Sequence, residues 1–189
     1  MNWLKEDLKK ANEERDIRPW LFVGSHHPLY CGVDWRLPLD LNNFGSFNGN
    51  GNCGVDTLKL RPIFEDLFNE AGVDIYWQAH VHNYERDSPI YNNVTVLSDD
   101  DGPNHHFNAN APVYIVTGNA GNHDSHNDPI SPTPQLWERF GSNSYGYGLF
   151  TVYNKTHTYW EYYDSFTTEV IDHLWLVKDR PTYTFNKQS

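Results

Sequence analysis

Two histidine groups, each directly after an apolar run, constrain the fold of this chain more than any other feature. Residues 73–77 are rich in β-branched and aromatic side chains, as a buried strand is, and His80 and His82 follow them. An earlier apolar run, residues 20–25, ends in the same way at His26. A helix predicted between the two runs completes a βαβ unit, whose strands run parallel. Because open α/β sheets bind ligands at the carboxyl ends of their strands, we expect the two histidine groups to meet there.

This arrangement predicts a metal site. In an extended chain, residues two apart point to one side, so His80 and His82 are expected to serve one metal ion or two adjacent ions. Imidazole suits zinc, iron and manganese. A histidine pair within one strand is more often structural, so the hypothesis depends on His26 closing the neighbouring strand.

Charge and composition exclude several classes of partner. The formal net charge is −11, which argues against a nucleic acid or a membrane surface. No apolar run approaches the roughly 18 residues that a membrane span needs, and no apolar signal segment follows Met1. The two cysteines, Cys31 and Cys53, flank a loop rich in glycine and asparagine; we favour one disulfide over two buried thiols.

The remaining patterns predict one partial domain, residues 1–180, followed by a tail at 181–189. Residues 1–15 are expected to form an amphipathic helix, with Trp3, Leu4, Leu8 and Ala11 on the packing side. Thr57 is expected to cap a second helix at 58–71, with Leu58, Ile63, Leu67 and Phe68 inward and Gly72 ending it. Strands are predicted at 89–91, 94–97 and 113–117, loops at 28–56, 98–111 and 125–144, and antiparallel strands at 147–153, 158–163 and 170–177.

Two blocks of the sequence resemble metal-binding blocks of the purple acid phosphatases. Residues 23–30, VGSHHPLY, resemble the Val-x-x-His block of that family, and residues 79–86, AHVHNYER, resemble its Gly-His-x-His block with the Tyr-Glu-Arg that follows. Residues 112–115 with their glycine turn, and residues 154–157, fall in the family's order. The resemblance spans nearly the whole chain and is closest to the animal and protist members.

The resemblance implies a fold and a metal centre. The fold would be α/β, the C-terminal half of a metallophosphoesterase-type αββα sandwich, in which a parallel βαβ unit precedes antiparallel strands. The centre would be binuclear, Fe(III) with Zn, Mn or Fe(II): His26 and His80 would bind the divalent ion, and His82 the ferric ion.

The resemblance also implies an activity, acid phosphatase, in which a metal-bound hydroxide attacks a phosphate monoester. A neighbouring histidine would protonate the leaving group. His27 is the first candidate for that role, and His105 and His106 are weaker ones. A small-molecule phosphomonoester would be the substrate, and the protein would be secreted, lysosomal or vacuolar. Asn93 and Asn154 each begin an Asn-x-Thr pattern for N-glycosylation.

The sequence departs from the family pattern before His26. The family's Asp-x-Gly, Gly-Asp-x-x-Tyr and Gly-Asn-His-Glu/Asp blocks are absent there, and Ala79 replaces a glycine. Three neutral imidazoles cannot balance two adjacent cations, which need carboxylate, phenolate and hydroxide ligands. We therefore expect an N-terminal part of the same domain to supply these groups, and this chain alone to be inactive. Two alternatives remain: a non-catalytic metal-binding or extracellular glycoprotein module, and an unrelated α/β protein with one structural zinc.

Overall fold

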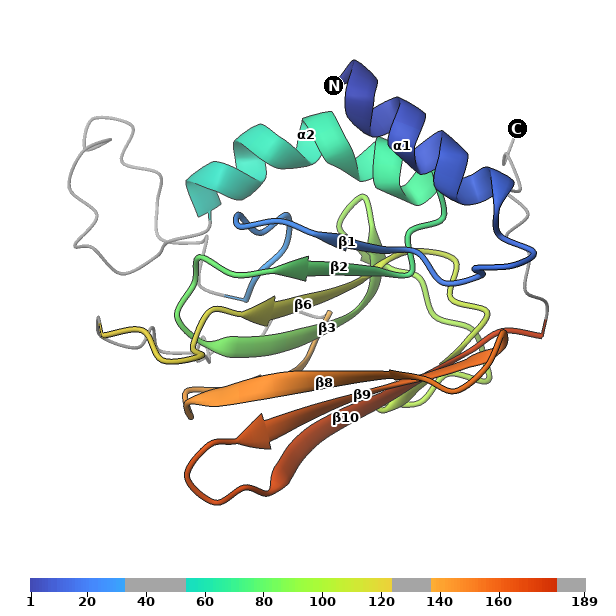
Figure 1. The fold of residues 1–189 in the computed structure, drawn as a ribbon. Helices are drawn as coiled ribbons and strands as arrows, with labels where there is room; N and C mark the ends of the chain where they lie inside the picture. Colours follow the sequence, from blue (N-terminus) through green and yellow to red (C-terminus); the bar gives the residue numbers. More distant parts are fainter. Residues whose placement is uncertain (33–53, 124–136, 180–189) are drawn as a thin grey trace.

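The computed structural model describes residues 1–32, 54–123 and 137–179, and it has three layers: two helices, a mixed sheet and a second sheet (Figure 1). The helices are α1 (Asn2–Glu13) and α2 (Gly54–Glu70). The strands are β1 (Phe22–Gly24), β2 (Ile75–Gln78), β3 (Tyr84–Tyr91), β4 (Val94–Thr95), β5 (His105–Phe107), β6 (Val113–Thr117), β7 (Glu138–Ser142), β8 (Gly146–Val152), β9 (His157–Asp164) and β10 (Val170–Val177). The predicted α/β class is confirmed.

The first sheet contains the predicted βαβ unit. Its strand order is β1-β2-β6-β3-β4, and β7 also pairs with β3. β1, β2 and β6 are parallel, with Gly24 opposite Trp77 and Trp77 opposite Ile115. The first four residues of β6 are buried, as the apolar run at 113–117 predicts for a central parallel strand. β1 and β2 therefore end at the same edge.

The strand after the second histidine group is longer than predicted. β3 begins at Tyr84, whereas the sequence predicted a strand only at 89–91, and it pairs antiparallel with β6. Asn92 and Asn93, with φ of 51° and 62°, form the turn into β4. Two successive residues with positive φ are typical of the type I′ turn that joins antiparallel strands.

The second sheet has the order β5-β10-β9-β8. β8, β9 and β10 are antiparallel, which confirms the three alternating segments at the end of the chain. Two expectations were wrong. β5, which pairs parallel with β10, lies in the expected loop 98–111, and β7 lies in the expected loop 125–144. Both strands are short and polar, so their pairing depends on neighbouring strands and leaves little local pattern.

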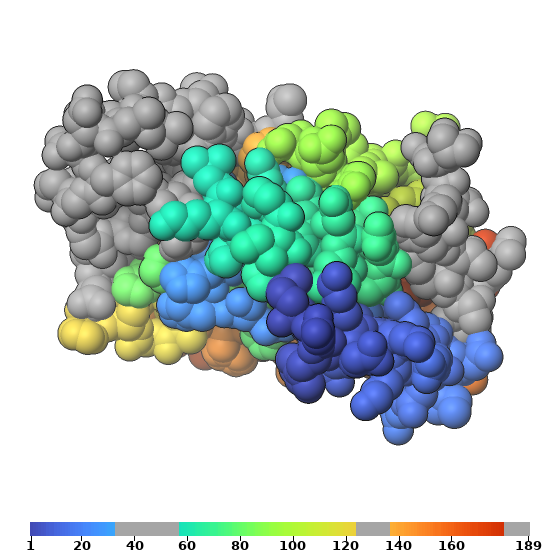
Figure 2. Space-filling model, turned by 90° about the horizontal axis from the view of Figure 1, so that it is seen from above, coloured from blue at the N-terminus to red at the C-terminus, as the bar shows by residue number. Residues whose placement is uncertain are grey.

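The two helices lie side by side over the outer face of the first sheet (Figure 2). The last residue of α2 is Glu70, and Gly72 terminates the helix as predicted: it has φ 64°, and the Val73 N–H bonds to the Phe68 carbonyl at 3.0 Å. However, α2 begins at Gly54, three residues before the expected cap at Thr57. Leu58 is 55% exposed, which corrects its predicted inward position.

The inward faces of both helices differ in part from the predicted ones. Ile63 and Trp3 are exposed, whereas Leu60 and Phe64 pack against the core. Leu8 of α1 and Phe68 of α2 are buried in one cluster with Tyr76 and Tyr114 of the sheet. The other buried members of this cluster are Leu29, Tyr30, Ala71, Val73 and Ile90. This cluster fixes the helices on the sheet.

A second apolar cluster joins the two sheets. Tyr84 of β3 stacks on Tyr162 of β9, with ring centroids 3.6 Å apart, and Trp160 and Leu174 are buried beside them. The inward residues of β9 alternate strictly with half-exposed ones, as the sequence pattern predicted.

Cys31 is disulfide-bonded, which confirms the disulfide inferred from composition; the other cysteine, Cys53, lies outside the described residues. The predicted tail at 181–189 also lies outside them, as does most of the expected loop 28–56. In the described part of the chain, neither helix has the length and apolar character of a membrane span.

Candidate metal centre

The pairing of β1 with β2 continues past the strand ends and brings His26 beside His80. The Ser25 N–H bonds to the Trp77 carbonyl at 2.9 Å, and the Ala79 N–H bonds to the His26 carbonyl at 3.0 Å. His26 Nε2 and His80 Nδ1 lie 3.1 Å apart. The two histidine groups therefore meet at the carboxyl ends of the parallel strands, as the topology predicted.

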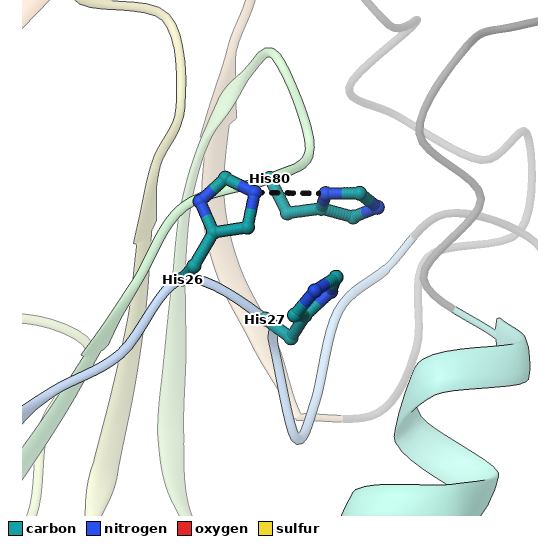
Figure 3. Close-up of side chains that lie close together, drawn as sticks. All are labelled: His26, His27 and His80. Carbon is teal, nitrogen blue, oxygen red and sulfur yellow. Dashed lines mark hydrogen bonds between the residues drawn. The ribbon is translucent and has the colours of Figure 1, made fainter.

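His27 joins this pair, so three imidazoles converge (Figure 3). The ring centroid of His27 lies 4.5 Å from that of His80 and 4.9 Å from that of His26. One ligand atom from each ring lies within 4.8 Å of the others. His26 is exposed and the other two are half-buried, so an ion could enter from solvent.

A tight turn in the backbone orients His80. The Val81 N–H bonds to the Ala79 carbonyl at 2.7 Å, which closes a three-residue turn centred on His80, whose φ is 66°. For a residue other than glycine, this conformation costs about 1–3 kcal/mol and is found most often at functional sites. The prediction that His80 and His82 share an extended strand is wrong, because β2 ends at Gln78.

Gly118, directly after β6, holds this turn from the other side. A Cβ on Gly118 would lie 1.9 Å from the Val81 carbonyl oxygen, and the Gly118 N–H bonds to the Asn83 carbonyl at 3.1 Å. Only a glycine allows the two backbone segments to approach so closely. The turn after β6 therefore supports residues 79–83.

His82 is half-buried, one residue before the buried Asn83 and the start of β3. Among the described residues, the cluster of possible metal ligands consists of His26, His27 and His80 and does not include His82. The structure thus brings together two of the three predicted ligands and adds His27.

His105 and His106, the weaker candidates for leaving-group protonation, lie on β5 in the second sheet. His106 is fully buried, and desolvation lowers its pKa to about 4. Its ring is therefore mostly neutral at mildly acid pH and lacks the imidazolium proton that a general acid would give. Neither histidine belongs to the cluster at the end of β1 and β2.

β3 is anchored to the second sheet by a buried ion pair. Arg86 donates to Asp172 from Nε at 2.7 Å and from Nη2 at 2.8 Å, and the Tyr84 hydroxyl donates to the same carboxylate at 2.5 Å. Trp160 donates to the Tyr84 hydroxyl at 2.9 Å. This network fixes the strand that begins directly after the histidine segment.

The opposite face of β3 carries two buried carboxyl groups that the sequence analysis missed. Glu85 and Asp87 are fully buried, and Glu138 of β7 lies near them. Desolvation is the largest cause that raises both pKa values: that of Asp87 to about 7, and that of Glu85 well above its usual range. The signal that could have revealed them is their alternation with Tyr84 and Arg86 along one strand.

The three imidazoles fit a transition metal ion. Zinc–nitrogen bonds of about 2.0–2.1 Å place two tetrahedral ligand nitrogens about 3.3–3.4 Å apart. The 3.1 Å between His26 Nε2 and His80 Nδ1 is close to this, and it also suits an N–H···N hydrogen bond. A binuclear centre needs anionic ligands as well, and no carboxylate belongs to this cluster of described residues.

Comparisons with known proteins show which proteins this chain is similar to. Residues 111–173 match the family model described as "Iron/zinc purple acid phosphatase-like protein C". Acid phosphatase type 7 of Danio rerio is 38% identical over 181 residues, which are 94% of this chain and 39% of that protein. Acid phosphatase type 7 of Homo sapiens is 33% identical over 177 residues, 93% of this chain and 38% of that protein.

The fold is shared with a solved structure. A purple acid phosphatase isolated from yellow lupin (Lupinus luteus) seeds superposes with a TM-score of 0.72 at 21% identity, covering 100% of this chain and 31% of that one. The chain spans about two fifths of the length of the curated relatives it matches. As the histidine blocks predicted, the chain is similar to the purple acid phosphatases.

Proposed function

We propose that this chain supplies the histidine ligands of an acid phosphatase, which hydrolyses small phosphate monoesters. The observation that carries the proposal is the 3.1 Å approach of His26 to His80 at the carboxyl ends of β1 and β2. The similarity of the chain to the purple acid phosphatases supports a binuclear centre of iron with zinc, manganese or a second iron. When bound, such a pair of ions activates water as the nucleophile and stabilises the charge that develops on phosphate.

Within this proposal, His26 and His80 hold the divalent ion and His82 holds the ferric ion. Hydrolysis forms a bond from water oxygen to phosphorus and breaks the bond to the leaving oxygen, which then takes a proton. His27 is placed to give that proton, since its ring lies beside those of His26 and His80. His106 is excluded from this role by its lowered pKa of about 4.

The proposal requires anionic ligands from polypeptide outside this chain. Three imidazoles carry no negative charge, and two metal ions a few ångströms apart repel one another without a bridging anion. β1 is the end strand of its sheet and leads directly to His26, so a further strand could add there and carry carboxylates to the site. On this account the 189 residues alone are inactive.

The test is turnover of p-nitrophenyl phosphate by the protein expressed from its complete coding sequence. We expect His82→Ala to abolish turnover and any iron–tyrosinate colour, while His173→Ala, on the second sheet, leaves both unchanged. Retained turnover in His82→Ala would refute the assignment of that residue. Absence of turnover in the complete wild-type protein, with metals bound, would favour the alternative of a non-catalytic metal-binding module.

We also propose that the protein is secreted, or resides in a lysosome or vacuole. The disulfide at Cys31 supports an oxidising compartment, and Asn93 and Asn154 both lie exposed at turns, where a glycan could be attached. Treatment of the native protein with an N-glycosidase should increase its electrophoretic mobility. Unchanged mobility would contradict the glycoprotein assignment.

A further inference from the structure

We propose that Tyr76 and Gln78 of β2, neither of which belongs to the histidine cluster, are positioning residues for His26 and His27. Their side chains hold the segment that follows β1, residues 26–30, against the end of β2. We call this pair of side chains the β2 clamp. The inference rests on the proposed function in one respect, the assignment of His26 as a ligand of the divalent ion.

The backbone pairing of β1 with β2 stops at the beginning of this segment. The Ala79 N–H bonds to the His26 carbonyl at 3.0 Å, and among the described residues this is the last backbone bond of the pairing. Pro28, which follows His27, has no N–H with which to continue it. The position of His27 and of the residues after it therefore depends on other contacts.

The side chain of Gln78 bonds to the segment directly after this pairing stops. The Leu29 N–H donates to Gln78 Oε1 at 2.9 Å, and Gln78 Nε2 donates to the Tyr30 carbonyl at 2.6 Å. Gln78 is 1% exposed, and Leu29 and Tyr30 are buried as well. A buried amide that bonds to one stretch of backbone through both its carbonyl and its NH₂ group fixes the position and the orientation of that stretch.

Tyr76 holds the same segment nearer to its beginning. Its hydroxyl donates to the His27 carbonyl at 3.1 Å. Residues two apart in a strand point to the same face, so Tyr76 and Gln78 both act from the face of β2 that packs against the helices. The clamp therefore contacts the backbone on both sides of Pro28.

The far end of the segment is anchored to α2. The Tyr30 hydroxyl donates to the Glu65 carboxylate, and it accepts from the Asn93 N–H at 3.0 Å. Residues 26–30 are thus tied to β2 at one end and to α2 at the other. This leaves His27 little freedom to move relative to the strand ends.

The expected consequence concerns the geometry of the metal site. Functional side chains must stay within about 0.5 Å of their productive arrangement, and outer partners of metal ligands typically contribute about 10–100-fold to metal affinity. His26 Nε2 lies 3.1 Å from His80 Nδ1. Because the β2 clamp bonds to the backbone that carries His26 and His27, its loss should disturb this approach while the two sheets stay folded.

The test compares Gln78→Met and Tyr76→Phe with Thr158→Val, in the protein expressed from its complete coding sequence. Thr158 is the matched control, since it is fully buried on β9 of the second sheet and its hydroxyl donates to the Thr151 carbonyl at 3.0 Å. Hydrogen–deuterium exchange under native conditions measures the mobility of residues 26–30. Calorimetric titration of the metal-free protein measures its affinity for zinc.

We expect Gln78→Met to accelerate exchange of the Leu29 N–H by about tenfold or more and to weaken zinc binding by about 10–100-fold. Tyr76→Phe, which removes only a hydroxyl group, should change both quantities in the same direction by less. Thr158→Val should leave both within about threefold of the wild-type values, because it lies far from the segment. A purely structural role would lower the unfolding temperature without changing the zinc affinity of the folded protein.

Unchanged exchange at residues 26–30 in both clamp variants, or faster exchange with unchanged zinc affinity, would overturn the inference. A loss of zinc affinity in Thr158→Val as large as that in Gln78→Met would also overturn it. If Gln78→Met does not fold, Tyr76→Phe decides the question by the same criteria. Zinc binding without turnover of p-nitrophenyl phosphate in the wild-type protein would contradict only the proposed function, whereas absence of zinc binding would contradict both.

Discussion

At the scale of single residues, the histidine cluster depends on one glycine. Any side chain at Gly118 would collide with the Val81 carbonyl. This carbonyl belongs to the tight turn in which His80 has a positive φ. Because the approach of His80 to His26 depends on the shape of this turn, we expect a change at Gly118 to affect the metal site.

We predict that Gly118→Ala destabilises the protein by about 1–3 kcal/mol and weakens zinc binding, because the added methyl group must displace residues 79–83. Urea unfolding and zinc titration measure the two effects. Gly24→Ala is the matched control, since a Cβ there meets nothing within 4 Å, although Gly24 lies two residues before His26. Equal behaviour of the two variants would show that the close approach has no consequence.

The second residue-scale prediction concerns the buried carboxyl groups of β3. The pKa of Asp87 is raised to about 7, chiefly by desolvation, so the folded state holds a proton that the unfolded chain releases near pH 4. This stabilisation is fully present below about pH 4 and is lost as the pH rises through about 7. Glu85, whose pKa is also raised, acts in the same direction.

We therefore expect the contribution of Asp87 to the melting temperature to fall between about pH 4 and pH 7, and Asp87→Asn to remove this contribution. His106 acts with the opposite sign over much of the same range, because its lowered pKa of about 4 removes stability as the pH falls below about 6.5. The effect of Asp87 is therefore measured as the difference between wild type and Asp87→Asn. Asp7→Asn on exposed α1 is the control. A slope that is the same in wild type and Asp87→Asn would rule out Asp87 as its source.

At the scale of elements, β3 is the strand that couples the histidine segment to the rest of the fold. Its Arg86–Asp172 pair is buried, with the side chains 1% and 3% exposed. Because neighbours in a strand point to opposite faces, Glu85 lies on the other face of β3 from Arg86.

We predict that Asp172→Asn costs about 3–5 kcal/mol, because it leaves the Arg86 guanidinium buried without a counter-charge. Denaturant unfolding gives this value. The exposed pair of Arg18 with Glu14 provides the contrast: Arg18→Ala should change stability by less than about 1 kcal/mol, since both side chains are more than half exposed. Comparable losses for the two variants would contradict the importance of burial.

The elements that sequence predicted well are those with a strong internal pattern. Apolar periodicity predicted β6 and the alternating strands β8 to β10. Turn chemistry predicted that Gly72 terminates α2. β5 and β7 were missed because they are short and polar, and the inner face of α2 was partly wrong because packing against the sheet, rather than periodicity, selects Leu60 and Phe64.

The candidate metal centre, too, could be predicted only in part from the sequence. The meeting of His26 and His80 follows from the parallel βαβ topology and could be predicted. The inclusion of His27 and the bend at His80 could not, because both depend on the conformation of a turn that no periodic pattern encodes. The pair Glu85 and Asp87 was missed for a different reason: charged residues are rarely assigned to a buried strand.

At the scale of the whole molecule, the first sheet brings the carboxyl ends of the parallel strands β1 and β2 side by side. The helices cover one face of the first sheet and the second sheet covers the other (Figure 1). His26, which follows β1 at this edge, is exposed to solvent, and His27 and His80 are half-buried. The three-layer fold is shared with a purple acid phosphatase structure.

The most direct test of this account is a crystal of the chain soaked in zinc, with anomalous diffraction recorded at the zinc absorption edge. The account predicts a peak about 2.0–2.1 Å from His26 Nε2 and His80 Nδ1, at the ends of β1 and β2. A map in which zinc lies elsewhere, or in which this edge holds no anomalous peak, would contradict it.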